Sequence, residues 1–153
     1  MTLTELFSHD IASKIGAALL CGMAVGLNRD LNRKPAGVRT FGLLALGTVV
    51  LTIAMTLHPD SGDASRVVQG IVTGIGFLGA GMIMRPVNDF EIHGLTTAAA
   101  VWTTAVLAIL CGLGQVSLAL VGLAVTLFLL WAGLYIERAF ERWFGVESPD
   151  KKS

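Results

Sequence analysis

The stretch from Leu95 to Ile136 decides the fold class, and it reads LTTAAAVWTTAVLAILCGL, then GQ, then VSLALVGLAVTLFLLWAGLYI. It holds two apolar runs, Leu95 to Leu113 and Val116 to Ile136. Each has the roughly 17 to 25 residues that a membrane-spanning helix needs. Only Gly114 and Gln115 separate the two runs. The stretch therefore predicts two helices that cross a lipid bilayer as a tight antiparallel pair.

Three further apolar runs lie upstream, from Ile11 to Leu27, from Phe41 to Leu57 and from Val67 to Met84. They are continuously apolar, whereas the strands of a membrane β-barrel alternate in segments of about ten residues. In lipid the backbone must satisfy its own hydrogen bonds, which favours helices. The sequence predicts an all-α, polytopic transmembrane helix bundle of about five spans. Residues 1–136 would form the membrane domain and residues 137–153 a short cytoplasmic tail.

The composition excludes an ordinary soluble domain. Of 153 residues, 54% are hydrophobic and 14% are charged, and the mean hydropathy is +0.71; soluble domains are about 25% charged. The net charge of zero does not favour nucleic acid as a partner. Cys21 and Cys111 lie inside apolar runs and are interpreted as buried free thiols. No basic segment precedes the first run, so we expect that run to remain as a membrane helix and not to be removed as a signal peptide.

Lys and Arg residues are unevenly distributed, and five spans would place most of them on one side of the membrane. Those on the first side are Arg29, Arg33, Lys34, Arg39, Arg85, Arg138, Arg142, Lys151 and Lys152, and those on the other are Lys14 and Arg66. Positive residues concentrate on the cytoplasmic side of membrane proteins. We therefore expect the N-terminus outside and the C-terminus in the cytoplasm.

The third run is rich in glycine, and the segment from Gly74 to Gly79 matches the dinucleotide-binding pattern G-x-G-x-x-G. That pattern needs a strand before it, and here it lies inside an apolar run, so nucleotide binding is disfavoured. Helix packing is favoured, because small residues let helix backbones approach closely in lipid. The small residues of this run include Gly70, Gly74, Gly76, Gly79 and Gly81, and the first run has Gly22 and Gly26. We expect the third run at the centre of the bundle, and its glycines leave open a helix break between Gly79 and Gly81.

Polar residues in the runs allow two interpretations, hydrogen bonds between helices or the lining of a hydrophilic passage. They lie at helical spacing as Gln69 with Thr73, Thr96 with Thr103, and Thr97 with Thr104. Hydrogen bonding is favoured, because a threonine hydroxyl is readily satisfied by the preceding turn. No acidic residue lies deep in a run, which disfavours a cation carrier with a charged midplane site. The histidines lack metal-ligand spacing, so the sequence predicts no metal site and no cofactor.

The connection from Asn28 to Thr40 is dense in charge. It is either a positive anchor that contacts anionic lipid or a loop with a specific shape, as Pro35 and Gly37 indicate. Thr40 is a candidate cap for the second helix.

Three segments resemble the signatures of the MgtC/SapB membrane proteins of bacteria: Gly26 to Asp30 with Lys34 to Thr40, then Gly74 to Gly81, then Gly94 to Trp102. The resemblance implies a bacterial inner-membrane protein that is not an enzyme, from a family associated with growth at low magnesium and survival inside host cells. The functional positions that it implies are Arg29, Asp30, Lys34, Pro35, Gly37, Arg39, Thr40, Arg66, Thr96, Thr97 and Trp102. The sequence departs from the family pattern at two positions. It has Asn28 where the family usually has Glu, and Asp30 where the family often has Glu. Because the sequence ends soon after Ile136, we expect it to resemble the short SapB-like branch, which lacks a C-terminal soluble domain.

Our leading hypothesis is a regulator that binds other membrane proteins through its spans and cytoplasmic loops. The small-residue helix faces and the family resemblance support it. The alternative is a channel or transporter for ions or small solutes, related to magnesium, that uses the faces of Gln69 and Thr96. The expected partners are the lipid bilayer, other membrane proteins and a second copy of the chain.

Overall fold

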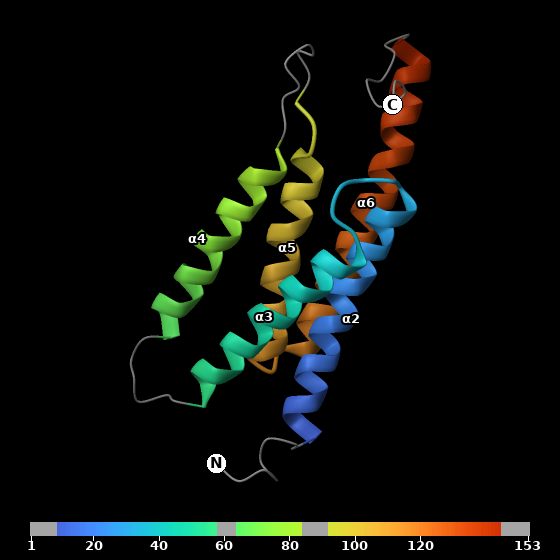
Figure 1. Cartoon of the computed structure of the whole chain (residues 1–153). Helices are drawn as coiled ribbons and strands as arrows, with labels where there is room; N and C mark the ends of the chain where they lie inside the picture. Colours follow the sequence, from blue (N-terminus) through green and yellow to red (C-terminus); the bar gives the residue numbers. More distant parts are fainter. Residues whose placement is uncertain (1–8, 58–63, 84–91, 145–153) are drawn as a thin grey trace.

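The computed structural model describes residues 9–57, 64–83 and 92–144 of the chain. These residues form five helices, shown in Figure 1: α2 (His9–Leu31), α3 (Val38–Thr56), α4 (Ala64–Met82), α5 (Leu95–Gly112) and α6 (Val116–Phe144). The all-α prediction is confirmed. Helices α2, α3, α5 and α6 are long and apolar enough to cross a membrane, so the chain is a multi-pass membrane protein.

Helix α4 is the fifth helix and is not among the four that are long and apolar enough to cross a membrane; it carries Arg66, Gln69 and several glycines. Its 19 residues give it a length of about 28 Å, close to the roughly 30 Å of the bilayer's hydrocarbon core. Its length therefore suits a fifth span.

Two helices extend beyond the predicted runs. Helix α2 continues to Leu31 instead of ending at Leu27, so Arg29 and Asp30 belong to the helix and not to the loop. Helix α6 continues past Ile136 to Phe144. The division into a membrane domain and a tail at residue 136 therefore falls inside a helix, and it stays a prediction.

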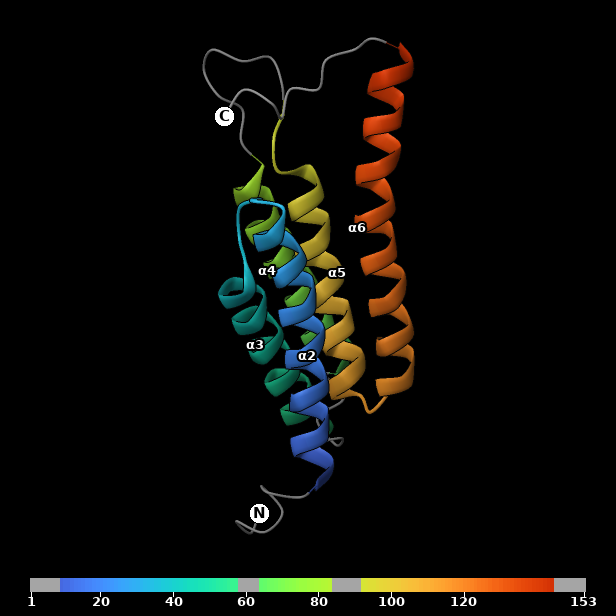
Figure 2. The same cartoon turned by 90° about the vertical axis from the view of Figure 1, so that its right-hand side faces the viewer.

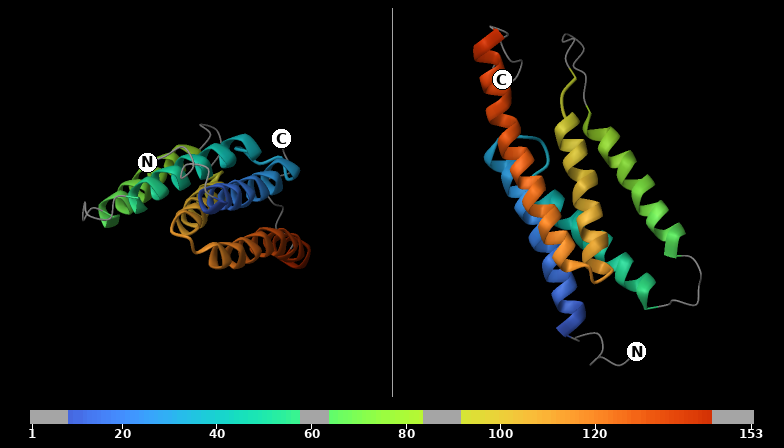
Figure 3. Two further views of the ribbon diagram at one scale, coloured as in Figure 1. Left: turned by 90° about the horizontal axis from the view of Figure 1, so that it is seen from below. Right: turned by 180° about the vertical axis from the view of Figure 1, so that it is seen from behind.

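Helix α5 lies at the centre of the bundle and contacts each of the other four helices. Seen from below in Figure 3, α3 and α4 lie on one side of α2 and α5, and α6 lies on the other. Figure 2 shows that α6 lies along the outer side of α5 and α2. Successive helices alternate in direction, so α2 starts and α6 ends at opposite ends of the bundle.

The predicted central position of the third run is wrong. Helix α4 lies at the edge of the bundle, where it packs against α5 and more lightly against α3. Only Ile71, Ile75 and Gly79 are buried among its described side chains. The helix also continues unbroken through Gly79 and Gly81 to Met82. A Cβ added at Gly70, Gly74, Gly76 or Gly81 would meet no atom within 4 Å, so among the described helices none packs closely on the small surface.

Close backbone packing occurs instead between α2 and α3, as the small face of the first run predicts. A Cβ on Gly22 would lie 2.6 Å from the Phe41 carbonyl oxygen, and one on Gly26 would lie 2.7 Å from the Val38 Cα. On the other side of α3, a Cβ on Gly112 of α5 would lie 2.6 Å from the Thr52 Cβ. Helices α2, α3 and α5 therefore form a tight core, which also buries Cys21 and Cys111 as free thiols.

The predicted hairpin of the last two spans is confirmed. Gly114 has a φ of 82°, which a residue with a side chain adopts only with strain. The backbone N–H of Gln115 donates to the Leu110 carbonyl at 2.8 Å and closes the end of α5. Helix α6 then starts at Val116 and packs back along α5.

Candidate functional site at the α2–α3 loop

The first and third signatures meet in space. A terminal guanidinium nitrogen of Arg29, near the end of α2, donates a hydrogen bond to the Thr97 hydroxyl at 2.6 Å. Thr97 lies in the first turn of α5. Arg29 is only 4% exposed and Thr97 is 1% exposed. The contact therefore joins two helix ends from inside the core, across 68 positions of sequence.

The surroundings of Arg29 leave part of its hydrogen-bonding capacity unused. Its Nε is buried and has no hydrogen-bond partner, and the side-chain oxygen of neighbouring Asn28 is also buried without one. Among the residues that the structure describes, no carboxylate forms an ion pair with Arg29. Buried cations in proteins are normally paired, because removing an unpaired charge from water is costly. Arg29 is therefore an exception that needs an explanation.

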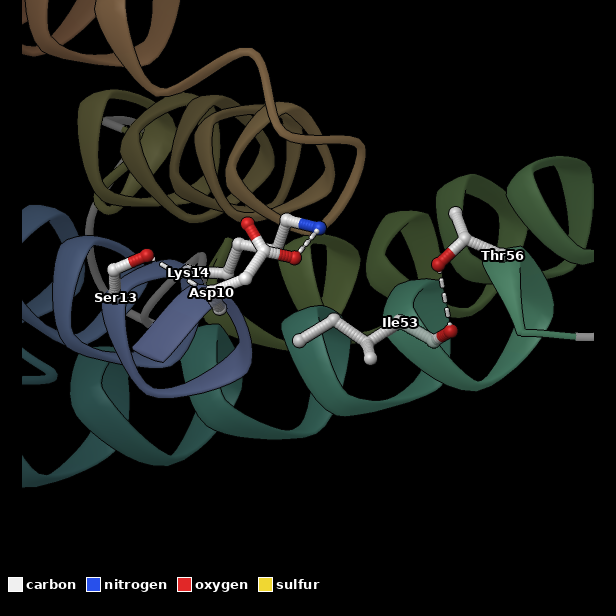
Figure 4. A network of polar contacts seen from close by, with 5 residues as sticks. All are labelled: Asp10, Ser13, Lys14, Ile53 and Thr56. Atoms are coloured by element: carbon white, nitrogen blue, oxygen red, sulfur yellow. Dashed lines mark hydrogen bonds and ion pairs between the residues drawn. The ribbon is translucent and has the colours of Figure 1, made fainter. Parts of the chain in front are cut away.

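The opposite end of the bundle provides a contrast, drawn in Figure 4. There the Lys14 ammonium lies 2.6 Å from a carboxylate oxygen of Asp10, one turn earlier in α2. Ser13 also donates to the Asp10 carbonyl, and Thr56 donates to the Ile53 carbonyl at the end of α3. The more exposed Lys14 is paired with an acid, and the buried Arg29 is not.

The loop between α2 and α3 is held by Asp30. One of its carboxylate oxygens accepts a hydrogen bond from the backbone N–H of Val38 at 2.9 Å, the first N–H of α3. A Cβ on Gly37 would collide with the same carboxylate, so glycine is needed there. Arg33 and Ala36 adopt positive φ values of 52° and 62°. The shaped loop that Pro35 and Gly37 indicate is therefore present.

The prediction that Thr40 caps the second helix is wrong. Helix α3 begins at Val38, Gly37 occupies the N-cap position, and no side chain caps this end from that position. The carboxylate of Asp30 satisfies the first N–H from the preceding helix instead. Pro35, Arg39 and Thr40 are exposed, and Lys34 is half-buried. The backbone N–H of Lys34 donates to the Arg29 carbonyl at 3.0 Å, which ties the loop to the end of α2.

The second signature does not join this site. Gly74, Gly76 and Gly81 have no atom of another element within 4 Å of an added Cβ, and Gly79 faces Ala98 of α5 at 3.7 Å. Arg66 and Gln69 are exposed near the far end of α4. An open, mainly apolar groove of about 310 Å³ separates α4 from α3, and its lining includes Gly47, Thr48, Gly70 and Gly74.

The two threonine stripes of α5 differ in exposure. Thr97 and Thr104 are buried, whereas Thr96 and the neighbouring Trp102 are exposed. The hydroxyls of Thr103 and Thr104 donate to carbonyls one turn earlier, each at 2.9 Å. Such bonds satisfy a hydroxyl within its own helix. Thr97 thus differs from the other buried threonine of its stripe, because its hydroxyl accepts from another helix.

The sequence did not foretell the pairing of Arg29 with Thr97. An arginine at the end of an apolar run is usually a headgroup anchor, and spacing along the chain does not connect residues on different helices. The sequence contained one indication of it: Arg29 and Thr97 both lie in segments that resemble signatures of the same family. Among the described residues, no group of His, Cys, Asp and Glu side chains could hold a metal ion.

Comparisons with known proteins agree with these signatures. A family model described as MgtC family matches residues 15–139. Protein MgtC of Salmonella typhimurium strain LT2 is 42% identical over 82% of this chain and 52% of its own length. Protein SrpB of Synechococcus elongatus is 40% identical over 74% of this chain and 69% of its own. An uncharacterized protein of Haemophilus influenzae is 37% identical over all of this chain and 67% of its own length.

The chain spans about half the length of the MgtC relatives from Salmonella that it matches. No solved structure matches it.

Proposed function

This chain belongs to the MgtC family, and we propose that it is a non-enzymatic membrane protein that regulates other membrane proteins by binding them. The binding surface would be the α4 glycine face, which consists of Gly70, Gly74, Phe77 and Gly81. These residues are three, four and seven positions apart and share one side of the helix. The observation that carries the proposal is that no other described helix packs closely on this face: a Cβ added at Gly70, Gly74 or Gly81 would meet no atom within 4 Å, and Phe77 is 81% exposed.

Glycines on an unpacked helix face are unfavourable by themselves. Each destabilises a helix interior by roughly 0.5–1 kcal/mol relative to alanine. They become favourable where another helix approaches the backbone, because helix association in lipid depends on close packing. Phe77 would supply the large aromatic contact that often anchors an interface. The fitting occupant is an apolar transmembrane helix of another protein, with its side chains over the glycines and against Phe77.

The alternative, a channel or transporter, has less support. Gln69 and Thr96, on the two faces that would line the passage, are exposed at the surface of the described bundle. Helices α2, α3 and α5 pack closely through Gly22, Gly26 and Gly112. Partner binding is therefore the function that the geometry favours.

The proposal places the chain in the bacterial inner membrane, with the start of α2 outside and the α2–α3 loop in the cytoplasm. The basic residues Arg29, Arg33, Lys34 and Arg39 at one end of the bundle support this orientation. A role in growth at low magnesium belongs to the same proposal and rests on the family alone.

Site-specific photocrosslinking in native membranes tests the proposal. A photoreactive residue at Gly74 or Gly81 should capture another membrane protein, whereas one at Gly16 of α2 should not, although Gly16 also has nothing within 4 Å. Phe77→Ala should lower the crosslinking yield. The matched control is Leu129→Ala, which truncates a 62% exposed side chain on α6 and should leave the yield unchanged.

Three results would contradict the proposal. They are capture of lipid only, capture of a second copy of the chain only, and equal capture from Gly16 and Gly74. A flux of magnesium or protons into proteoliposomes that is lost on Gln69→Leu or Thr96→Val would support the transporter instead.

A further inference from the structure

We propose that Arg29, Thr97 and the first turn of α5 form a binding site for a phosphate group, supplied by a lipid headgroup or by free phosphate. The site lies where the end of α2 meets the start of α5, and its residues are not those of the α4 glycine face. Its occupancy does not depend on the partner proposal.

The first observation is the state of the Arg29 side chain. Arg29 is 4% exposed as a residue, yet its buried Nε has no hydrogen-bond partner and the described residues give the side chain no carboxylate. Its one hydrogen bond goes to Thr97, a neutral hydroxyl, which leaves the positive charge uncompensated. An anion at the remaining donors would satisfy both the charge and the hydrogen-bonding capacity.

The second observation is the helix end beside Arg29. Gly94 is the N-cap residue of α5 and has a φ of 90°, and no side-chain hydrogen bond caps the helix. The backbone N–H groups of the first turn of a helix lack partners within the helix. Together with the helix dipole they favour an anion, and phosphate groups recur at such ends. Thr97 is the third residue of α5, so Arg29 lies directly against this turn.

The charges around the site also favour an anion. Arg33 and Lys34 belong to the loop that follows α2, and Arg39 lies in the first turn of α3. Asp30 is the one acidic residue in that segment, and its carboxylate already accepts the N–H of Val38. The local excess of positive charge should raise the concentration of anions near this end of the bundle.

Phosphate suits both the donors and the position of the site. The planar guanidinium matches the spacing of phosphate oxygens and can donate to two of them. The site also lies near the ends of α2 and α5, where the phosphates of lipid headgroups meet a membrane protein. A headgroup whose acyl chains lie along the bundle could reach it, and so could free phosphate.

Binding to the purified full-length chain, delipidated in a maltoside detergent, tests this site. The probes are inorganic phosphate, phosphatidylglycerol, and diacylglycerol, which has acyl chains but no phosphate. Native mass spectrometry reports retained ligand, and the fluorescence of the native tryptophans reports the thermal unfolding midpoint. We expect at least one phosphate-bearing probe to be retained and to raise the midpoint, and diacylglycerol to do neither. Sodium chloride at equal ionic strength controls for a general salt effect.

Substitutions test whether the phosphate group binds at the proposed site. Arg29→Gln should abolish the phosphate-dependent shift, and Thr97→Val should weaken binding roughly tenfold. Arg33→Gln removes an exposed charge of the same loop and should bind within about twofold of the wild type. Arg29→Lys keeps the charge without the planar fork, so it should be folded and bind more weakly than the wild type. This variant keeps the test valid if Arg29→Gln does not fold.

The outcomes distinguish lipid from free phosphate as the ligand and also include the results that would overturn the proposal. A shift with phosphatidylglycerol alone supports the site with lipid as the source, and a shift with inorganic phosphate supports it with the free ion. Binding that stays as strong as in the wild type in both Arg29 variants overturns the proposal. Absence of binding to the wild type overturns it as well, and assigns the counter-charge of Arg29 to a protein carboxylate.

Discussion

Single residues decide how closely α2 and α3 pack. A Cβ on Gly26 would lie 2.7 Å from the Val38 Cα and 2.9 Å from its nitrogen, and these backbone atoms cannot move without shifting α3. We therefore expect Gly26→Ala to lower the free energy of unfolding by about 1–3 kcal/mol. Unfolding in detergent, followed by circular dichroism, measures the change.

The matched control for this substitution lies in the same helix. Gly16 has nothing within 4 Å of an added Cβ, so Gly16→Ala should leave stability unchanged or raise it by up to about 1 kcal/mol, because alanine favours helix. Equal losses in the two variants would mean that the contact between α2 and α3 is looser than 2.7 Å implies.

The sequence could predict the residues of the candidate site but not their arrangement. Arg29, Asp30, Gly37 and Thr97 stand out through the resemblance, and the structure places them at one end of the bundle. The burial of Arg29 could not be predicted, because a charged residue at the end of an apolar run normally extends toward the headgroups. The extension of α2 to Leu31 moves Arg29 into the helix, where Thr97 of α5 meets it.

Among the elements, α4 shows the limit of a sequence pattern. Its glycines predict that a helix backbone approaches it, but the pattern does not say which helix. Within this chain α5 approaches only Gly79, and α2 and α3 pack against each other through Gly22 and Gly26. The existence of five helices follows from continuous apolar runs. Their neighbours depend on side-chain shape across helices, which one sequence does not display.

The position of α4 predicts its dynamics. Helix α5 contacts four helices, whereas α4 packs mainly against α5 and lightly against α3. Elements with few buried contacts open more readily. In purified protein, amide hydrogen exchange in detergent should therefore be faster in α4 than in α5, and Gly74 and Gly76 should weaken α4 further.

Helix α6 is the control for this order of exchange. It too lies at the edge of the bundle with many exposed side chains, but it is the most apolar of the candidate spans. We expect it to exchange more slowly than α4. Protection of α4 equal to that of α5 would mean that the purified protein already covers the α4 glycine face, as a second copy would.

At the scale of the whole molecule, Arg33 lies in the loop before α3 and Leu57 is the C-cap of α3, so the two residues flank opposite ends of that helix. Both are exposed, while the native Cys21 and Cys111 are buried and should give little background in thiol labelling. With the basic α2–α3 loop in the cytoplasm, a membrane-impermeant maleimide should label Leu57→Cys in intact spheroplasts. It should label Arg33→Cys only after the membrane is broken.

The same labelling decides which lipids meet Arg29. The cytoplasmic surface of a membrane is rich in anionic lipid, and each basic residue near it contributes about 1 kcal/mol of attraction. If Arg33→Cys is protected in spheroplasts, the buried Arg29 and the first turn of α5 lie at that surface, where anionic headgroups are abundant. The opposite labelling pattern would reject the orientation that the basic residues predict. It would also place the end of the bundle that holds Arg29 on the other face, where the pairing of Arg29 with an anionic headgroup would lose the support of the surface charge.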